Sequence, residues 1–217
     1  VTIDGANDVA TLDLIDNDAA IVSIGETADG SETGPVAGVF TVTQTAAASV
    51  DTVLTYSVDG SATNGTDFAA LSGTLTIAAG STSATIIVAT INDALVEATE
   101  DVIVTLTGFT ARDPNVTIDG ANDVATLDII DNDTATVSIA HTADGIETDS
   151  VAGVFTVTQT AAASVDTVLT YSVGGSATSS ADFTALSGTV TISAGSTTAT
   201  INVATVDDSL VEATEDV

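Results

Sequence analysis

The sequence predicts an all-β protein made of tandem antiparallel β-sandwiches, and three observations support that prediction. Short segments alternate apolar residues with Thr and Ser, as strands with one buried face do. Gly, Asn, Asp and Ser cluster between these segments, where turns are expected. The stretch Val1–Asp18 recurs almost unchanged at Val116–Asp133, an offset of 115 residues. A repeat of that length is typical of a domain rather than of a solenoid unit.

The same offset defines the boundaries of the repeats. At this offset Leu95–Val102 aligns with Leu210–Val217, with identical residues at every position. We therefore expect residues 1–18 to be the C-terminal strand of a preceding repeat and residues 19–133 to be a complete repeat. Residues 134–217 would be a following repeat that ends at the counterpart of Val102 and lacks its last two strands. The chain begins inside a motif, as an interior fragment would.

The complete repeat contains seven segments that read as strands. Apolar residues such as Leu54 with Tyr56, and Val102 with Val104, share one face of a segment, while Thr and Ser occupy the other. The seven ranges are Ala20–Ile24, Gly38–Gln44, Thr52–Val58, Gly73–Ala78, Ser83–Ile91, Asp101–Thr107 and Asp123–Ile130. About seven short strands with turn signals throughout predict an immunoglobulin-like sandwich, and the repeats are expected to follow one another head to tail.

The charge balance excludes several classes of partner. The chain has 31 acidic residues against one Lys or Arg, for a formal net charge of −30. Nucleic acids and anionic membrane surfaces would be repelled, and no apolar run is long enough to insert into a membrane. Cys is absent, which excludes disulfides and thiol chemistry. Such a chain suits a medium rich in cations, such as the exterior of a cell.

An acidic connection stands out within each repeat. Ile91–Asp101 and its copy Val206–Asp216 crowd acidic and amide side chains together with no Lys or Arg. Two carboxylates about 4 Å apart repel by roughly 4 kcal/mol at an effective dielectric constant near 20. Hard oxygen ligands suit Ca²⁺, whereas the alternative interpretation is a solvated acidic loop.

Strand direction favours the metal interpretation. If successive strands reverse direction, the loop with Asp67, the segment 92–100 and the segment 131–133 all reach one pole, and Glu32 joins them. The next repeat begins directly after Asp133. A cation held by Asp131 and Asp133 would therefore lie at the joint between repeats and would control its stiffness.

These residues resemble the Calx-β family, known from regulatory domains of the sodium–calcium exchanger and from bacterial surface proteins. The matching motifs are Asn64–Phe68 followed by Leu71–Leu75, the spacing of Asp93, Glu97 and Glu100, and Ile129–Asp133. The resemblance implies calcium ligands in the complete repeat at Glu32, Asp67, Asn92, Asp93, Glu97, Glu100, Asp131 and Asp133. In the second repeat it implies Glu147, Asp182, Asp207, Asp208, Glu212 and Glu215. Asn92 replaces the usual Asp, and the second repeat lacks the terminal Asp-Asn-Asp.

The leading functional hypothesis is a calcium-binding extender in a long secreted or cell-surface bacterial protein, such as an adhesin or filament. Its partners would be neighbouring repeats and, in a filament, laterally associated chains. The alternatives are a calcium-sensing module of a transporter or enzyme and an accessory module that binds polysaccharide. An enzyme is not expected, because no His or Lys is placed to activate the repeated Ser and Thr. The only His, His141, aligns with Glu26 and is interpreted as a surface residue.

Overall fold

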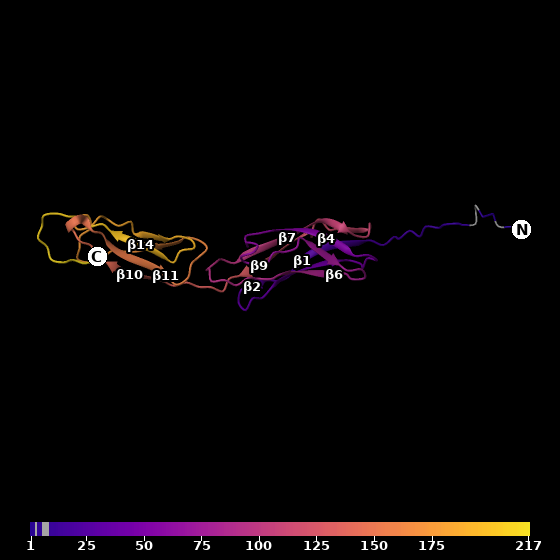
Figure 1. Cartoon of the computed structure of the whole chain (residues 1–217), viewed down its shortest axis with the longest axis horizontal. Helices are drawn as coiled ribbons and strands as arrows, with labels where there is room; N and C mark the ends of the chain where they lie inside the picture. The colour runs from indigo at the N-terminus through magenta and orange to yellow at the C-terminus, as the bar shows by residue number, and fades with distance from the viewer. Residues whose placement is uncertain (3, 6–8) are drawn as a thin grey trace.

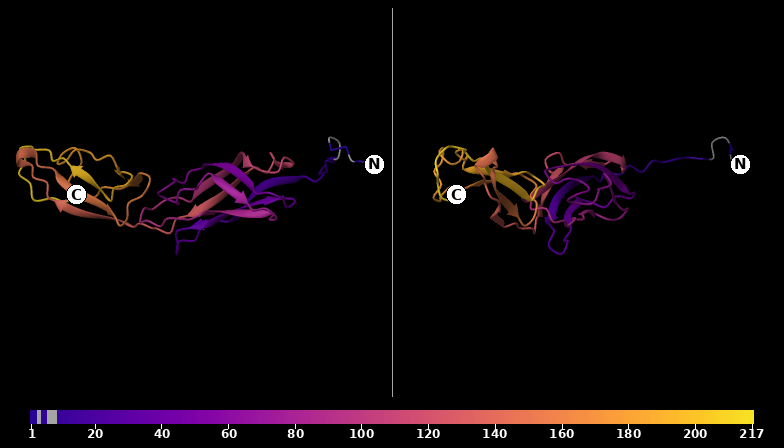
Figure 2. Two further views of the ribbon diagram at one scale, coloured as in Figure 1. Left: turned by 45° about the vertical axis from the view of Figure 1, so that its right-hand side comes forward. Right: turned by 60° about the vertical axis from the view of Figure 1, so that its left-hand side comes forward.

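The computed structural model describes residues 1–2, 4–5 and 9–217, and shows two β units in line behind an extended N-terminal segment (Figure 1). The strands of the first unit lie between Ala20 and Ile130 and those of the second between Val137 and Val203, and two further views show the same succession (Figure 2). A strand was expected within residues 1–18, but the described residues there (1–2, 4–5 and 9–18) form none, and residues 3 and 6–8 lie outside the described residues. Across the described ranges, no helix has the length and apolar character needed to cross a bilayer.

The first unit is a sandwich of two sheets, so the predicted all-β fold is confirmed. One sheet has the order β6-β3-β1-β8 and the other β2-β9-β7-β4-β5. The bounds are β1 Ala20–Ala28, β2 Gly30–Ser31, β3 Gly38–Gln44, β4 Thr52–Asp59, β5 Thr74–Ile77, β6 Ser83–Val88, β7 Glu100–Ala111, β8 Val116–Ile118 and β9 Val124–Ile130.

Alternation along the strands builds the core of this unit. In β7, Val102 and Val104 are fully buried, as is Leu54 of the neighbouring β4, and all three belong to one apolar cluster. Burial of each such side chain contributes about 1.5–3 kcal/mol to folding. Phe40 and Leu127 join the same cluster. The predicted inward faces are therefore confirmed, and the polar ends of the strands are left to form the poles.

Strand bounds differ from the prediction where short or irregular pairing occurs. The strand predicted at Ser83–Ile91 ends at Val88, because Thr90 leaves the sheet to bridge Phe68. The strand predicted to end at Thr107 runs on to Ala111 past register shifts opposite β4. Two short strands were not predicted, namely β2 and β8, which pair in parallel with β9 and β1. Strands of two or three residues are too short to show an alternating pattern.

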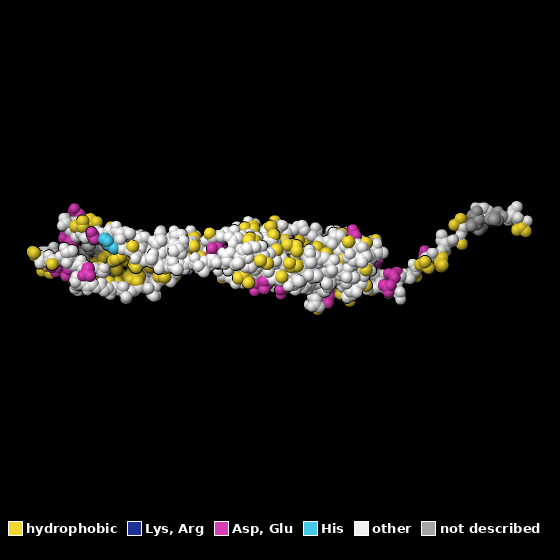
Figure 3. Space-filling view, turned by 90° about the horizontal axis from the view of Figure 1, so that it is seen from below, with side chains coloured by type: hydrophobic (Ala, Val, Ile, Leu, Met, Phe, Trp, Pro, Cys, Tyr) yellow, Lys and Arg dark blue, Asp and Glu magenta, His cyan; other side chains and the backbone are white. Residues whose placement is uncertain are grey.

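The second unit repeats part of this design. Its sheets have the orders β10-β11-β14 and β12-β13. The bounds are β10 Val137–Ala143, η1 Thr148–Ser150, β11 Gly153–Gln159, β12 Thr167–Thr170, β13 Thr189–Ile192 and β14 Thr198–Val203. The given sequence contains counterparts of only the first three residues of β7 and none of β9, and a hollow lined by apolar residues including Ile139, Phe155 and Leu186 lies on the corresponding face (Figure 3).

Candidate metal centre

Four loops of the first unit meet at the pole that faces the second unit, and their carboxylates form two groups. The Glu32 group contains Glu32, Asp93 and Asp133, and the Glu100 group contains Asp67, Glu97 and Glu100. Within each group, one carboxylate oxygen per residue lies within 4.8 Å of the others. Six of the eight residues proposed for the complete repeat are therefore brought together.

Glu32 is held in place by the loop that follows β2. Its backbone N–H donates to Ile130 O at 3.0 Å, next to the segment that leaves β9. Thr90 Oγ1 lies 3.1 Å from both Ser31 O and Val36 O, which fastens the two ends of this loop. Gly30 is required beneath it, because a Cβ there would approach Thr90 Cγ2 to 2.6 Å.

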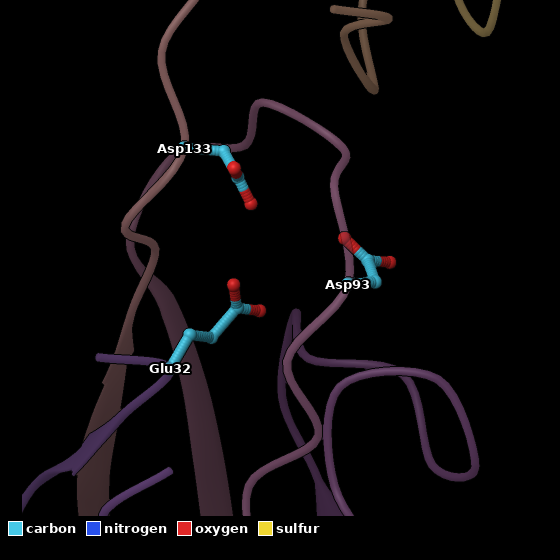
Figure 4. A group of neighbouring side chains, drawn as sticks. All are labelled: Glu32, Asp93 and Asp133. Atoms are coloured by element: carbon cyan, nitrogen blue, oxygen red, sulfur yellow. The ribbon is translucent and has the colours of Figure 1, made fainter. Parts of the chain in front are cut away.

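Two carboxylate oxygens of the Glu32 group are buried without a donor. Glu32 is 3% exposed, and its Oε2 atom has no hydrogen-bond partner among the described residues. Asp133 Oδ2 is in the same condition. Figure 4 shows the Glu32 and Asp133 carboxylates pointing toward one another, with Asp93 beside them. A buried, unpaired carboxylate is costly, so this arrangement fits a cation between the side chains.

Asp131 organises the loops around that group. Its Oδ2 accepts the Glu97 N–H at 2.8 Å, and its Oδ1 accepts the Asp133 N–H at 2.9 Å. Both oxygens therefore bind backbone, and the residue ties the segment after β9 to the acidic connection before β7. Asp131 lies in neither group but contributes charge to both.

Asn92 also links neighbouring segments through side-chain hydrogen bonds. Its Oδ1 accepts from Asn132 Nδ2 at 2.6 Å, and its Nδ2 donates to Asp93 O at 2.9 Å. These bonds join the acidic connection to the segment that leads to the next unit. The structure thus places Asn92 beside the Glu32 group without making it a member.

The Glu100 group is built on the loop between β4 and β5. Asp67 is 6% exposed, its Oδ2 accepts the Thr63 N–H, and its carbonyl accepts the Ile91 N–H at 2.8 Å. The adjacent Phe68 is buried in the core and anchors the loop. Asp67 is thereby fixed against the residues that open the acidic connection, where Glu97 and Glu100 reach it.

Crowding raises the pKa of the carboxyls in these groups. Burial, followed by the charges of Asp131 and Asp93, raises the pKa of Glu32 from 4.5 to about 7. Burial and a hydrogen bond with Asp67 raise the pKa of Glu100 to about 7 as well. The pKa of Glu97 is raised by burial and then by the charge of Asp67. A bound cation would favour the ionised forms and so lower the pKa values of these carboxyls.

Among the described residues, the second unit assembles one such group. Asp182, Glu212 and Glu215 repeat the Glu100 group. Glu147 is half-buried nearby, and Asp208 Oδ1 accepts the Leu210 N–H at 2.7 Å, but neither belongs to a group, and Asp207 is exposed. The given sequence stops before the position that would correspond to Asp133, so no copy of the Glu32 group is assembled in the described residues.

The donor set and its surroundings fit Ca²⁺. All members of the groups offer carboxylate oxygen, the ligand type that Ca²⁺ prefers. The single Arg, Arg112, donates to the carbonyls of Asp113, Pro114 and Val116 and lies over the Phe109 ring. Across the described ranges, no ion pair with Lys or Arg neutralises either group. When bound, Ca²⁺ would supply the missing positive charge and join the loops that carry its ligands.

Sequence comparison agrees with this assignment. The profile of the Calx-beta domain matches residues 16–133 and 131–217, which together span almost the whole chain. The chain belongs to the Calx-beta domain family. Calx-beta domains are calcium-binding domains, which makes Ca²⁺ the ion expected at these carboxylates. No match was found among curated proteins.

Several solved structures resemble the chain weakly. CBD12 from CALX1.2 is 18% identical with a TM-score of 0.43, covering 88% of this chain and 77% of that one. The apo-form Calx CBD1 domain is 21% identical with a TM-score of 0.44, covering 54% of this chain and 100% of that one. A two-domain protein of unknown function from Bacteroides fragilis is 9% identical with a TM-score of 0.37, covering 86% and 84%. Likenesses of this size support no statement about function.

Sequence reasoning missed Thr90, which positions the site without binding metal. Its hydroxyl fastens the Glu32 loop, and Thr205 makes the same two bonds to Ile146 O and Val151 O in the second unit. The only available signal was the recurrence of Thr at the end of an apolar strand. Thr is so common in this chain that the recurrence carries little information.

Proposed function

We propose that this chain is a calcium-binding extender, a stretch of a long secreted or cell-surface protein whose joints are stiffened by Ca²⁺. The observation that carries the proposal is the membership of Asp133 in the Glu32 group. Asp133 lies on the segment that leads directly from β9 into the second unit. An ion at this group would hold that segment against Glu32 and Asp93 of the first unit.

Loss of the ion has the opposite effect on the same segment. Without Ca²⁺, the ionised side chains of the Glu32 group repel each other, and Asp131 adds a further negative charge. Only six residues, 131–136, separate β9 from β10. Release of Asp133 would therefore free a large share of the joint and allow the units to change their relative orientation.

The acidic surface supports an extracellular or cell-surface location, in keeping with a bacterial adhesin or filament. The net charge of −30 is tolerated best where divalent cations are plentiful. Near-identical units suit a spacer, because length is gained by duplication without new binding chemistry. The role is structural rather than enzymatic, and lateral association of such rods would produce a filament.

Small-angle scattering of the full chain tests the extender role. In Ca²⁺ we expect a single elongated shape, and in EDTA at matched ionic strength a shorter average dimension with a broader distance distribution. The control is the Asp133→Asn variant, which should resemble the EDTA sample in both conditions. If wild-type scattering is the same with and without Ca²⁺, the ion does not set the joint, and a local calcium-sensing module becomes the better interpretation.

A further inference from the structure

A direct contact joins the two units at a place that no metal-site residue occupies. Val96 donates its N–H to Ala162 O at 2.8 Å, and its carbonyl accepts the Ser164 N–H at 3.0 Å. Val96 and Ala163 thus form an isolated parallel bridge. Val96 belongs to the acidic connection of the first unit, and residues 161–164 form the turn between β11 and β12 of the second.

The turn that receives Val96 is preformed. In the second unit, Ala163 O accepts the Gly195 N–H at 2.8 Å, and Asp166 Oδ1 accepts the Ala194 N–H at 2.8 Å. In the first unit, Ala48 O accepts the Gly80 N–H at 3.0 Å, and Asp51 Oδ1 accepts the Ala79 N–H at 2.9 Å. The turn therefore makes the same bonds to the loop after β5 or β13 whether or not a neighbouring unit contacts it.

Exposure differs between the two copies of the turn in the way that docking requires. Ala46 and Ala47 of the first unit are exposed, whereas Ala161 and Ala162 are half-buried and Ala163 is 9% exposed. The sequences of the two turns are identical. The difference follows the presence of the Val96 loop at one turn and not at the other.

The inserting loop is half-buried where it docks, at Leu95 and Val96. Their counterparts Leu210 and Val211 are 68% and 102% exposed, in a loop that has neither a neighbouring turn nor the segment around Asp131 that holds it in the first unit. Carboxylates hold the amides on both sides of Val96, since Asp93 accepts the Leu95 N–H and Asp131 accepts the Glu97 N–H. The peptide groups of Val96 are therefore presented outward by the folded loop.

We propose that Leu95–Val96 and Ala46–Ser49, with their copies in the second unit, are the two halves of a docking surface by which each repeat holds the next. The occupant of either free half is another copy of the repeat. The contact is heterologous, so it propagates along a row of repeats without closing on itself. It adds a defined orientation to the proposed extender role but uses backbone hydrogen bonds rather than metal, and it can be tested separately.

Proline substitution tests the inserting half in the full chain. Val96→Pro removes the donor N–H, and Val211→Pro makes the same change in the identical, undocked loop. The chain has no Cys, so Ser57→Cys and Thr158→Cys provide two unique sites for spin labels, one on each unit. We expect a narrow distance distribution for the parent pair and for Val211→Pro, and a broad one for Val96→Pro. An unchanged distribution in Val96→Pro would overturn the proposal.

The receiving half provides a second variant that leaves the acidic loops untouched. Ser164→Pro removes the other donor, and Ser49→Pro is its matched control in the first unit. Broadening with Ser164→Pro alone supports the docking surface even if Val96→Pro disturbs its own loop, and equal widths for both variants contradict it. Repeating the measurement in Ca²⁺ and EDTA separates the two proposals. If the width of the distance distribution depends on Val96 but not on Ca²⁺, the docking surface is supported and the calcium-stiffened joint is contradicted.

Oxidative trapping tests whether the free halves accept another copy. One sample carries Ala48→Cys and the other Val211→Cys, the counterparts of the bridged pair Ala163 and Val96. Disulfide formation accumulates even weakly populated complexes whose Cα atoms lie within about 4.4–6.8 Å. With the two samples at equal concentration, we expect mixed dimers in Ca²⁺ to make up well over half of all dimers, the share that random pairing gives. A statistical mixture would show that the free halves do not recognise each other.

Discussion

At the scale of single residues, the pole of the first unit concentrates acidic side chains where solvation is poor. Glu32 and Asp67 are 3% and 6% exposed, and their neighbours in each group are also acidic. Burial and nearby negative charge make these side chains costly to ionise, which raises the pKa values of Glu32 and Glu100. Such clusters are stable when a cation or protons compensate them, and both conditions lead to predictions.

The double substitution Glu97→Gln with Glu100→Gln should uncouple stability from calcium at the Glu100 group. In EDTA the variant should unfold at a higher temperature than the parent, because two mutually repelling acids are removed. In Ca²⁺ it should gain less, because two anionic ligands are lost. Thermal unfolding followed by circular dichroism measures both effects, with the exposed Glu26→Gln as control. A variant that loses stability in EDTA yet keeps the full calcium response would place the ion elsewhere.

The metal-free protein should become less stable as pH rises from about 4.5 to about 7. The pKa of Glu32 is 4.5 for the free side chain and about 7 in the fold, so the folded state binds more protons in this range. The stability that the extra bound proton contributes is fully present below pH 4.5 and is lost as the pH rises through about 7. For Glu32 the loss is on the order of 1–2 kcal/mol, since solvent screens part of the interaction at this pole.

Urea unfolding in EDTA at a series of pH values measures this loss, and Glu32→Gln should reduce it. The lowered pKa of Asp101, caused by its bond from Ser61, acts below 3.8 and does not overlap this window. Stability that rises between pH 4.5 and 7 would contradict the account. In Ca²⁺ the same range should show affinity rising with pH, because protons and the ion compete for the same oxygens.

At the scale of elements, the loops that carry the carboxylates are held by the strands between which they lie. Thr90 fastens the loop after β2, and Phe68 anchors the loop after β4 in the core. The carboxylates therefore do not have to organise their own backbone, which lets a binding site persist without metal.

Thr90→Val keeps the shape of the side chain and removes both bonds to the Glu32 loop. We expect a loss of about 1 kcal/mol in stability together with weaker calcium binding. Thr205→Val is a matched control, because Thr205 makes the same bonds in a unit without a copy of the Glu32 group. Calorimetric calcium titration distinguishes the two variants. An equal loss of affinity in both would show that Thr90 does not act through Glu32.

The elements also show how far the sequence predicts the structure. Regular alternation predicted β3 and β9 almost to the residue, since each buries every second side chain. The direction of the strands predicted which loops share a pole. The division of the carboxylates into two groups was not predictable, because it depends on which oxygens of Asp131 and Asp67 are taken by backbone amides. The bridge at Val96 leaves no pattern in the sequence, because a single residue has no periodicity.

At the scale of the whole molecule, the chain combines β-sandwich units, a short connection and an unusually acidic surface. Sandwich cores supply most of the folding free energy, as the fully buried residues of β7 illustrate. The pole between the units makes the stability of the molecule depend on calcium, because its carboxylates repel one another and oppose folding until an ion is bound. Calcium should therefore change stability and shape together.

Thermal unfolding of the full chain in Ca²⁺ and in EDTA, at matched ionic strength, tests the central claim of a calcium site at this pole. Extracellular modules bind Ca²⁺ with dissociation constants of about 10⁻⁴ to 10⁻³ M, and saturation at 100 times that constant contributes about 2.7 kcal/mol. For a unit of this size we predict a rise of roughly 10 °C in the melting temperature, with a smaller rise in Mg²⁺. Superimposable melting curves in Ca²⁺ and EDTA would contradict the account.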